Sequence, residues 1–247
     1  MRLRVLASGS SGNGYILYNE TTALVIECGC RYVDVLKALD FDRGKIAGAL
    51  ISHEHQDHAG CVGSYLGAAI KCYASAGTWD ALGMSREPHV RVLLPKTKVD
   101  VGPFRVMGFD TQHDAKEPFG FLIYHPEMGT TLFATDTYYI RYQFAHLAHL
   151  MIECNYESGI LDENMRNGTT HWKVGRRVRT SHMSLEQCVD TLLANDLSCV
   201  NDIVLVHLSH NNSDGELFQR KVSEATGKLV TIARPGVDID FNKNKIL

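Results

Sequence analysis

The sequence predicts a mixed α/β fold, because short apolar runs of strand length alternate along the chain with stretches of helical spacing. The chain has 247 residues, of which 45% are hydrophobic, so it is long enough to bury a large core. No repeat, low-complexity tract or Pro/Gly-rich linker interrupts it. We therefore expect one domain over residues 1–247, with a lid-like segment at about 157–181.

Two patterns locate the elements of the N-terminal half. Strands are expected where apolar runs are separated by Gly, Ser, Asn and Thr, which favour turns. Helices are expected where apolar residues recur every three or four positions, as Val33, Leu36 and Leu39 do. These patterns predict strands at 3–7, 14–18, 23–27 and 46–51, and helices that begin near residues 33 and 62.

The C-terminal half continues the alternation. Residues 91–133 predict a further series of strands, and the apolar run 203–206 predicts a buried strand. Between them, Ser184 and Gln187 have the spacing of a capping box at the start of a helix.

The most informative motif is His-Glu-His-Gln-Asp-His at residues 53–58, directly after the expected strand 46–51. On an extended or loosely turned loop, His53 and His55 project to the same side, while Asp57 and His58 continue around the turn. One loop then offers two ligands to each of two adjacent cations. A polar surface loop is the other interpretation, but His and Asp clustered beside a buried strand usually form metal or catalytic sites.

Four further polar residues follow in order along the chain. His113, Asp136 and His207 each come after an apolar run with strand character, and His182 lies in a turn before the capped helix. Taken alone, His113 or His207 would more often be a hydrogen-bonded core histidine. Together with the motif at 53–58, they favour a metal site.

In this combination and order, the residues resemble the metallo-β-lactamase superfamily over the whole chain. The resemblance implies a four-layer αββα sandwich. It also implies that two cations are held, one by His53, His55 and His113 and the other by Asp57, His58 and His207, with Asp136 as the bridge. The expected cofactors are two Zn²⁺ ions, with Mn²⁺ or Fe as alternatives, since the ligands include no thiolate.

The resemblance also suggests which residues take part in catalysis. Phosphodiesterase branches of the superfamily carry a histidine at the position of His182, where it would protonate the leaving oxygen. A structural histidine near the start of a helix is the alternative. Glu153 follows a buried strand and is expected to orient His182 or a metal ligand. The expected catalytic residues are His182, Asp57 and Glu153.

The N-terminal loop Ser-Gly-Ser-Ser-Gly-Asn at 8–13 and the polar segment after His207 resemble the YycJ/WalJ-type and RNase Z-like side of the superfamily. The loop is suited either to a simple strand-to-strand turn or, less strongly, to phosphate binding. The expected substrate-binding residues are Ser10, Asn13, Asn155, Arg177 and Asn211.

The expected substrate is a 3′,5′-cyclic mononucleotide, opened to the linear monophosphate. The segment 160–179 resembles that of phage and bacterial anti-Pycsar cyclic-nucleotide phosphodiesterases, and a formal charge of -3 weighs against a long polyanion. The alternative is a YycJ/WalJ-type DNA exonuclease or an RNase Z-like nuclease, with the basic cluster Lys173, Arg176, Arg177 and Arg179 on the nucleic acid. A non-catalytic metal-binding scaffold is the second alternative. A homodimer is expected by the same analogy.

Composition and cysteine usage favour a cytoplasmic protein, in the bacterial host if a phage encodes it. The N-terminus has no signal-peptide core, and no apolar run reaches the length of a bilayer span, so no membrane partner is expected. None of the seven cysteines forms a Cys-x-x-Cys motif, and an odd number cannot all pair. Reduced thiols are therefore expected.

Overall fold

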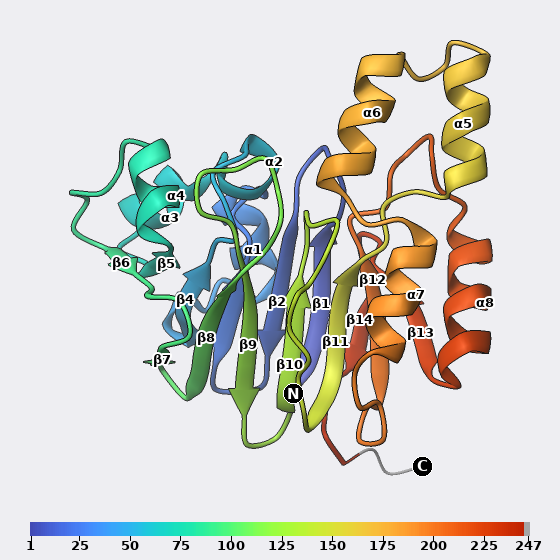
Figure 1. Ribbon diagram of the computed structural model, residues 1–247. Coiled ribbons are helices and arrows are strands. Elements are labelled where there is room, and N and C mark those ends of the chain that lie inside the picture. Colours follow the sequence, from blue (N-terminus) through green and yellow to red (C-terminus); the bar gives the residue numbers. More distant parts are fainter. Residues whose placement is uncertain (245–247) are drawn as a thin grey trace.

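The computed structural model describes residues 1–244 as two seven-stranded sheets packed face to face, with helices on both outer surfaces (Figure 1). The first sheet contains, in spatial order, β14 (Asp238–Asp240), β1 (Arg2–Ala7), β2 (Gly14–Tyr18), β3 (Ala23–Ile26), β4 (Ile46–Leu50), β5 (Cys72–Ala74) and β6 (Val90–Val92). Strands β14 to β3 pair antiparallel and strands β3 to β6 pair parallel.

The second sheet has the same division into an antiparallel and a parallel part. It contains β13 (Leu229–Ile232), β12 (Asp202–Val206), β11 (Leu147–Glu153), β10 (Gly129–Ala134), β9 (Phe119–His125), β8 (Phe104–Asp110) and β7 (Lys98–Val101). Strands β10 to β13 are parallel, and β7 to β10 are antiparallel. The strands predicted between residues 91 and 133 are confirmed.

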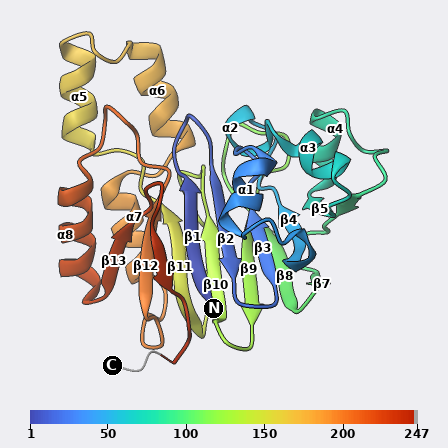
Figure 2. The same cartoon turned by 180° about the vertical axis from the view of Figure 1, so that it is seen from behind.

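Helices cover the outer face of each sheet, as the views from the front and from behind show together (Figure 2). On the first sheet lie α1 (Tyr32–Ala38), the 3-10 turn η1 (Arg43–Lys45), α2 (Gln56–Ala59), α3 (Val62–Gly67) and α4 (Ala76–Ala81). With the second sheet lie α5 (Ser158–Arg166), α6 (Trp172–Ser181), α7 (Leu185–Leu193) and α8 (Gly215–Thr226). The short helices α2 and α4 escaped sequence prediction, because a helix of one or two turns shows too few apolar repeats.

The side chains of β12 show why the chain folds into four layers. Successive residues of a strand point to opposite faces. Val204 and Val206 enter the core between the two sheets, whereas Ile203 and Leu205 enter the core beneath α7 and α8. A third apolar cluster lies beneath α1 and α3. Three cores between four layers confirm the predicted αββα sandwich.

Two local predictions bear on the site. Ser184 and Gln187 form the expected capping box at the start of α7, which fixes the backbone just after His182. The segment 157–181 forms a helical hairpin, α5 and α6, that projects beyond the edge of the sheets (Figure 1). Its action as a lid stays a prediction.

All seven cysteines are free thiols. Among the helices of residues 1–244, none combines the length and the apolar character that a membrane crossing requires.

Candidate metal centre

The predicted ligands lie together beyond the carboxyl ends of the strands that precede them. His53 follows β4, His113 follows β8, Asp136 follows β10 and His207 follows β12. Because β10, β11 and β12 are parallel neighbours, their carboxyl ends meet at one edge of the sheet. The seven predicted ligands fall into two groups that share Asp136.

The short helix α2 divides the ligands of the segment 53–58 into two pairs. His55 has an extended backbone and occupies the N-cap position of α2, so Asp57 and His58 lie in the first turn of that helix. The main chain is held on its other side, where the Asp57 carbonyl accepts the Asn13 N–H at 2.7 Å. His53 and His55 therefore reach one ligand group, and Asp57 and His58 reach the other.

The first group consists of His53, His55, His113 and Asp136. His53 Nε2 lies 3.0 Å from His55 Nδ1, which lies 3.2 Å from His113 Nε2. Asp136 Oδ2 is 3.4 Å from His113 Nε2 and 3.9 Å from His53 Nε2. Ligand atoms on one tetrahedral zinc ion lie about 3.3 Å apart, so these four atoms have the spacing of one coordination shell.

The second group consists of Asp57, His58, His207 and the same Asp136. Asp57 Oδ2 lies 3.2 Å from His58 Nε2 and 3.4 Å from His207 Nε2. Asp136 Oδ1 lies 3.3 Å from His58 Nε2 and 2.7 Å from His207 Nδ1. Asp136 thus directs one oxygen at each group, which is the arrangement of a bridging carboxylate.

An unsatisfied polar atom shows that these residues fit a divalent cation. His207 Nε2 is buried and has no hydrogen-bond partner within residues 1–244. In the first group, three imidazole nitrogens and a carboxylate oxygen converge. Such a set has more lone pairs than protons to share, so a cation satisfies it. Imidazole and carboxylate ligands suit Zn²⁺, Mn²⁺ or Fe.

The electrostatics of the two groups differ. Burial lowers the pKa of His53 and of His113, which leaves both imidazoles neutral and able to bind metal. The pKa of His207 lies well above its usual range. Burial by itself would lower this pKa, but the nearby Asp136 carboxylate has the larger effect. The pKa of His58 is raised by Asp136 and Glu27 in the same way. Metal binding to the second group therefore releases protons.

Two of the ligands have strained backbone conformations. Asp136 has φ of 46° and His207 has φ of 55°, in the left-handed region that costs a non-glycine residue about 1–3 kcal/mol. Side-chain bonds hold both positions. The Thr135 hydroxyl donates to Asp136 Oδ1 at 2.8 Å, and the His207 N–H donates to Ser8 Oγ at 2.8 Å. Strain of this kind is typical of functional sites.

Glu153 connects His182 to the second ligand group. Its Oε1 accepts from His182 Nδ1 at 2.7 Å and lies 3.3 Å from His207 Nδ1. Burial raises the pKa of Glu153, but His182 outweighs burial and holds it below its usual value. The pKa of His182 is raised. Burial alone would lower this pKa, but the effect of the Glu153 and Asp136 carboxylates is larger. Since Nδ1 bonds to Glu153, Nε2 is the ring nitrogen left for a substrate.

Glu27 is a site residue that the sequence interpretation missed. It is fully buried at the end of β3 with φ of 67°. Its Oε2 accepts the Ser52 N–H at 3.3 Å and lies 3.6 Å from His58 Nδ1. The available signal was an acidic residue at the end of an apolar strand, 23–27, where a carboxylate is costly unless paired.

The N-terminal loop contacts ligands from two segments of the metal centre. Ser8 accepts a hydrogen bond from the His207 backbone N–H. The Asn13 side chain is fully buried, and its amide lies 3.2 Å from the Asp57 carbonyl and 3.1 Å from His58 Nε2. Ser10 is exposed on the same loop. Asn13 is thus placed to position ligands, whereas Ser10 is accessible to a substrate.

The remaining expected substrate-binding residues lie in different surroundings. Asn155 is buried and donates to the His207 carbonyl at 2.8 Å, so it supports the ligand loop. Arg177 lies on α6 and donates to Asp114 Oδ2 at 2.7 Å, beside His113. Asn211 is exposed, and its carbonyl accepts from the Asn164 side chain of the helical hairpin.

Comparisons with known proteins agree with this geometry. The chain is 27% identical over 255 residues to the exodeoxyribonuclease WalJ of Streptococcus pneumoniae serotype 2, covering 96% of this chain and 91% of that protein. It is 26% identical over 239 residues to the exodeoxyribonuclease YycJ of Bacillus anthracis, covering 91% and 88%.

Among solved structures, the metallo-beta-lactamase fold protein YhfI from Bacillus subtilis superposes with a TM-score of 0.69 at 17% identity, over 97% of this chain and 99% of that one. This likeness shows the fold. A model of the metallo-beta-lactamase superfamily matches residues 7–140, which is more than half of the sequence and includes the motif at 53–58, His113 and Asp136. The chain therefore belongs to the metallo-beta-lactamase superfamily.

Proposed function

We propose that this protein is a two-metal phosphodiesterase that degrades DNA as an exonuclease. The observation that carries the proposal is the pair of ligand groups sharing Asp136, with His182 held beside them by Glu153. Relatives that share about a quarter of its residues over nearly its whole length are exodeoxyribonucleases, which supports the choice of DNA.

His53, His55, His113 and Asp136 would hold one Zn²⁺ ion, and Asp57, His58, His207 and Asp136 the other. When bound, two such cations lower the pKa of a water molecule and neutralise the charge of a phosphate in its transition state. The Asp57 side chain is 21% exposed, against 4% for Asp136. Asp57 is therefore the carboxylate that orients the attacking water from the open side.

His182 would protonate the leaving ribose oxygen. In its protonated form, Nδ1 donates to Glu153 Oε1 and Nε2 donates to the oxygen that departs. Burial opposes the protonated form, but the Glu153 and Asp136 carboxylates outweigh burial and raise the pKa of His182. Glu153 also contacts His207, so one buried carboxylate aligns the acid with the metal centre.

The sequence alone favours a cyclic mononucleotide over DNA. The curated relatives carry exodeoxyribonuclease names instead, and this supports the second substrate class. The cyclic-nucleotide reaction stays a prediction, because the same centre can attack either phosphodiester. A homodimer also remains part of the proposal, and light scattering on the eluting protein tests it.

A substrate panel tests the proposed function. Protein loaded with Zn²⁺ or Mn²⁺ is incubated with end-labelled single-stranded DNA, duplex DNA, RNA and 3′,5′-cyclic mononucleotides. We expect stepwise release of nucleotides from DNA ends, and EDTA should stop it. Asp136→Asn should be inactive, whereas the exposed Asp100→Asn serves as the matched control.

Three outcomes separate the proposal from its rivals. Cleavage of cyclic CMP, UMP, AMP or GMP without degradation of DNA would establish the cyclic-nucleotide function. Cleavage of RNA alone would favour an RNase Z-like nuclease. A metal-loaded protein that hydrolyses none of these substrates, nor bis-p-nitrophenyl phosphate, would be a binding scaffold.

A further inference from the structure

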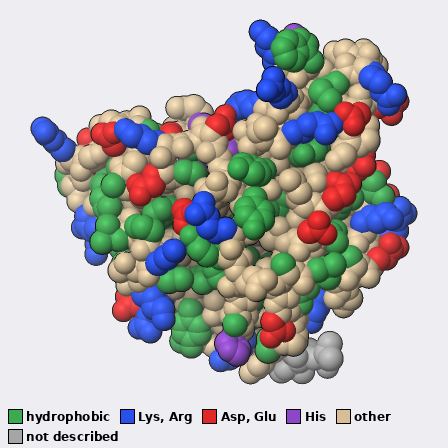
Figure 3. All heavy atoms as spheres, viewed as in Figure 1, with side chains coloured by type: hydrophobic (Ala, Val, Ile, Leu, Met, Phe, Trp, Pro, Cys, Tyr) green, Lys and Arg blue, Asp and Glu red, His purple; other side chains and the backbone are tan. Residues whose placement is uncertain are grey.

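One side of helix α6 carries a stripe of polar and basic residues. Lys173, Arg176, Arg177 and Thr180 have the spacing i, i+3, i+4 and i+7, which places them on one face. All four line a cavity of about 530 Å³ that also includes the metal ligand His113. Figure 3 shows Lys and Arg side chains gathered on the projecting hairpin above a hollow in the surface.

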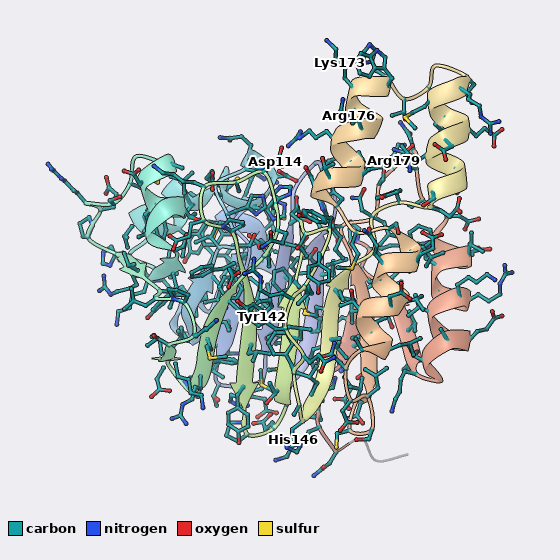
Figure 4. The ribbon with its side chains drawn as sticks, in the orientation of Figure 1. Asp114, Tyr142, His146, Lys173, Arg176 and Arg179 are labelled. Carbon is teal, nitrogen blue, oxygen red and sulfur yellow. The ribbon has the colours of Figure 1, made fainter. Side chains whose placement is uncertain are left out.

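The opposite side of α6 packs against α5. A Cβ atom on Gly175 would lie 2.2 Å from Met165 Sδ, so the two helices touch there. Arg179 forms an ion pair with Asp162 of α5, and Figure 4 shows it between the two helices. The hairpin contacts therefore orient α6 and turn its stripe toward the metal centre.

The cations of the stripe are not equivalent. Arg177 Nε forms an ion pair with Asp114 Oδ2 at 2.7 Å, and this pair connects α6 to the loop that carries His113. Within residues 1–244, no carboxylate lies within ion-pair distance of Lys173 or Arg176, and both are exposed on the surface of the helix. Two unpaired cations beside a phosphodiesterase centre attract an anionic substrate.

A second cavity, of about 580 Å³, shares one lining residue with the first. Tyr138 lines both, and the second is formed by residues 138–143 and α7. Tyr138 and Tyr139 are partly exposed. The charges here are an acid, Asp190, and Arg141, which lies 3.4 Å from Asp110. The surface thus changes from cationic beside His113 to aromatic farther away.

We propose that the two cavities form one groove that receives the end of single-stranded DNA. The inference rests on the proposed nuclease function. Phosphates would lie against Lys173 and Arg176, and bases would stack on Tyr138 and its neighbour Tyr139. A single strand is favoured over a duplex because paired bases are stacked inside the helix and do not offer their faces to tyrosines.

Steady-state kinetics of the metal-loaded protein on a single-stranded oligonucleotide test the groove. Each phosphate contact to a single strand contributes about 0.7 to the slope of log affinity against log salt concentration. The double variant Lys173→Ala with Arg176→Ala should reduce this slope, measured on 1/KM, by about 1.4. At 0.1 M salt its KM should rise on the order of 25-fold while kcat changes little.

Matched variants isolate the groove from general effects of charge. Arg166→Ala with Lys221→Ala removes the same charge from exposed positions on α5 and α8 that lie outside the groove, so its KM should stay within about twofold of wild type. The charge-preserving pair Lys173→Arg with Arg176→Lys should restore the wild-type salt slope. Melting temperature and metal content confirm that each variant is folded.

Substitution of Tyr138 tests the aromatic half of the groove. Tyr138→Ala should raise KM for the oligonucleotide by at least about fivefold, since stacking on a ring is lost, and Tyr138→Phe should not.

The possible results are distinct. Wild-type protein that degrades DNA, with equal KM and salt slope in the groove and control double variants, would overturn the groove alone. A wild-type protein that cleaves no DNA would overturn both the groove and the proposed function.

Discussion

Replacing Gly29 with alanine should disable the metal centre although Gly29 is not a ligand. A Cβ atom at this position would lie 1.9 Å from the Asp57 carbonyl oxygen and 2.7 Å from the Asn13 nitrogen. Both neighbours are main-chain atoms, and they are already joined by a 2.7 Å hydrogen bond. No side-chain rotation can relieve the contact, so the backbone around Gly29, Asn13 and Asp57 must move.

The required movement is large compared with what a metal ligand tolerates. Cβ contacts below 3.0 Å essentially do not occur, so the distance between this Cβ atom and the Asp57 carbonyl oxygen must increase by about 1.1 Å. Metal–ligand distances hold to about 0.2 Å. Overpacking of this kind costs about 1–3 kcal/mol, which for a chain of this size lowers the melting temperature by roughly 2–12 °C.

Elemental analysis and thermal unfolding measure both consequences. Gly29→Ala should bind less Zn²⁺ than wild type after identical loading and dialysis, and its hydrolysis of bis-p-nitrophenyl phosphate should fall with its metal content. Gly67→Ala is the matched control, because no atom lies within 4 Å of the added methyl group. If Gly29→Ala retained wild-type metal content and activity, the loop 28–29 would not position Asp57.

Three further results are expected. Fully loaded protein should contain two divalent ions per chain, and Asp136→Ala should lose most metal because the two cations then repel each other without a bridge; saturation at one ion would contradict this. His182→Ala should keep its metal yet turn over substrates with alkoxide leaving groups about 10²- to 10⁴-fold more slowly, with a smaller loss on p-nitrophenyl esters; equal losses would make the residue structural. Burial raises the pKa of Asp238, but hydrogen bonds from Tyr18, Arg4 and Arg2 outweigh it and lower that pKa. The Asp238 carboxylate therefore stabilises the fold above the ordinary pKa near 4, and this contribution disappears as the pH falls through the lowered value. In urea unfolding, Asp238→Asn should cost about 1–3 kcal/mol at pH 7 and progressively less in acid; a difference independent of pH would refute the assignment.

The amino-acid sequence determined much of the architecture and the ligand set, because both follow from local patterns. Apolar runs of strand length and the capping box at Ser184 are short-range signals. The motif at 53–58 and the polar residues that follow β8, β10 and β12 are readable for the same reason. Parallel strands of one sheet end at one edge, so residues placed after them must come together.

Only the tertiary structure decided which polar residues support the centre and which stay exposed beside it. Asn13 and Asn155 resemble surface loop residues in sequence but are buried against Asp57 and His207. Ser8 holds the backbone of His207 across 199 positions of the chain. Such contacts have no local signature, because they depend on how the two sheets are packed.

The basic cluster at 173–179 shows the same division. The sequence determined that four cations follow one another on a single segment. The packing of α6 on α5 decided that Arg179 pairs with Asp162, while Lys173 and Arg176 face the cavity beside His113. Helical periodicity defines the faces of a helix, and the neighbour that covers one face decides which of them remains open.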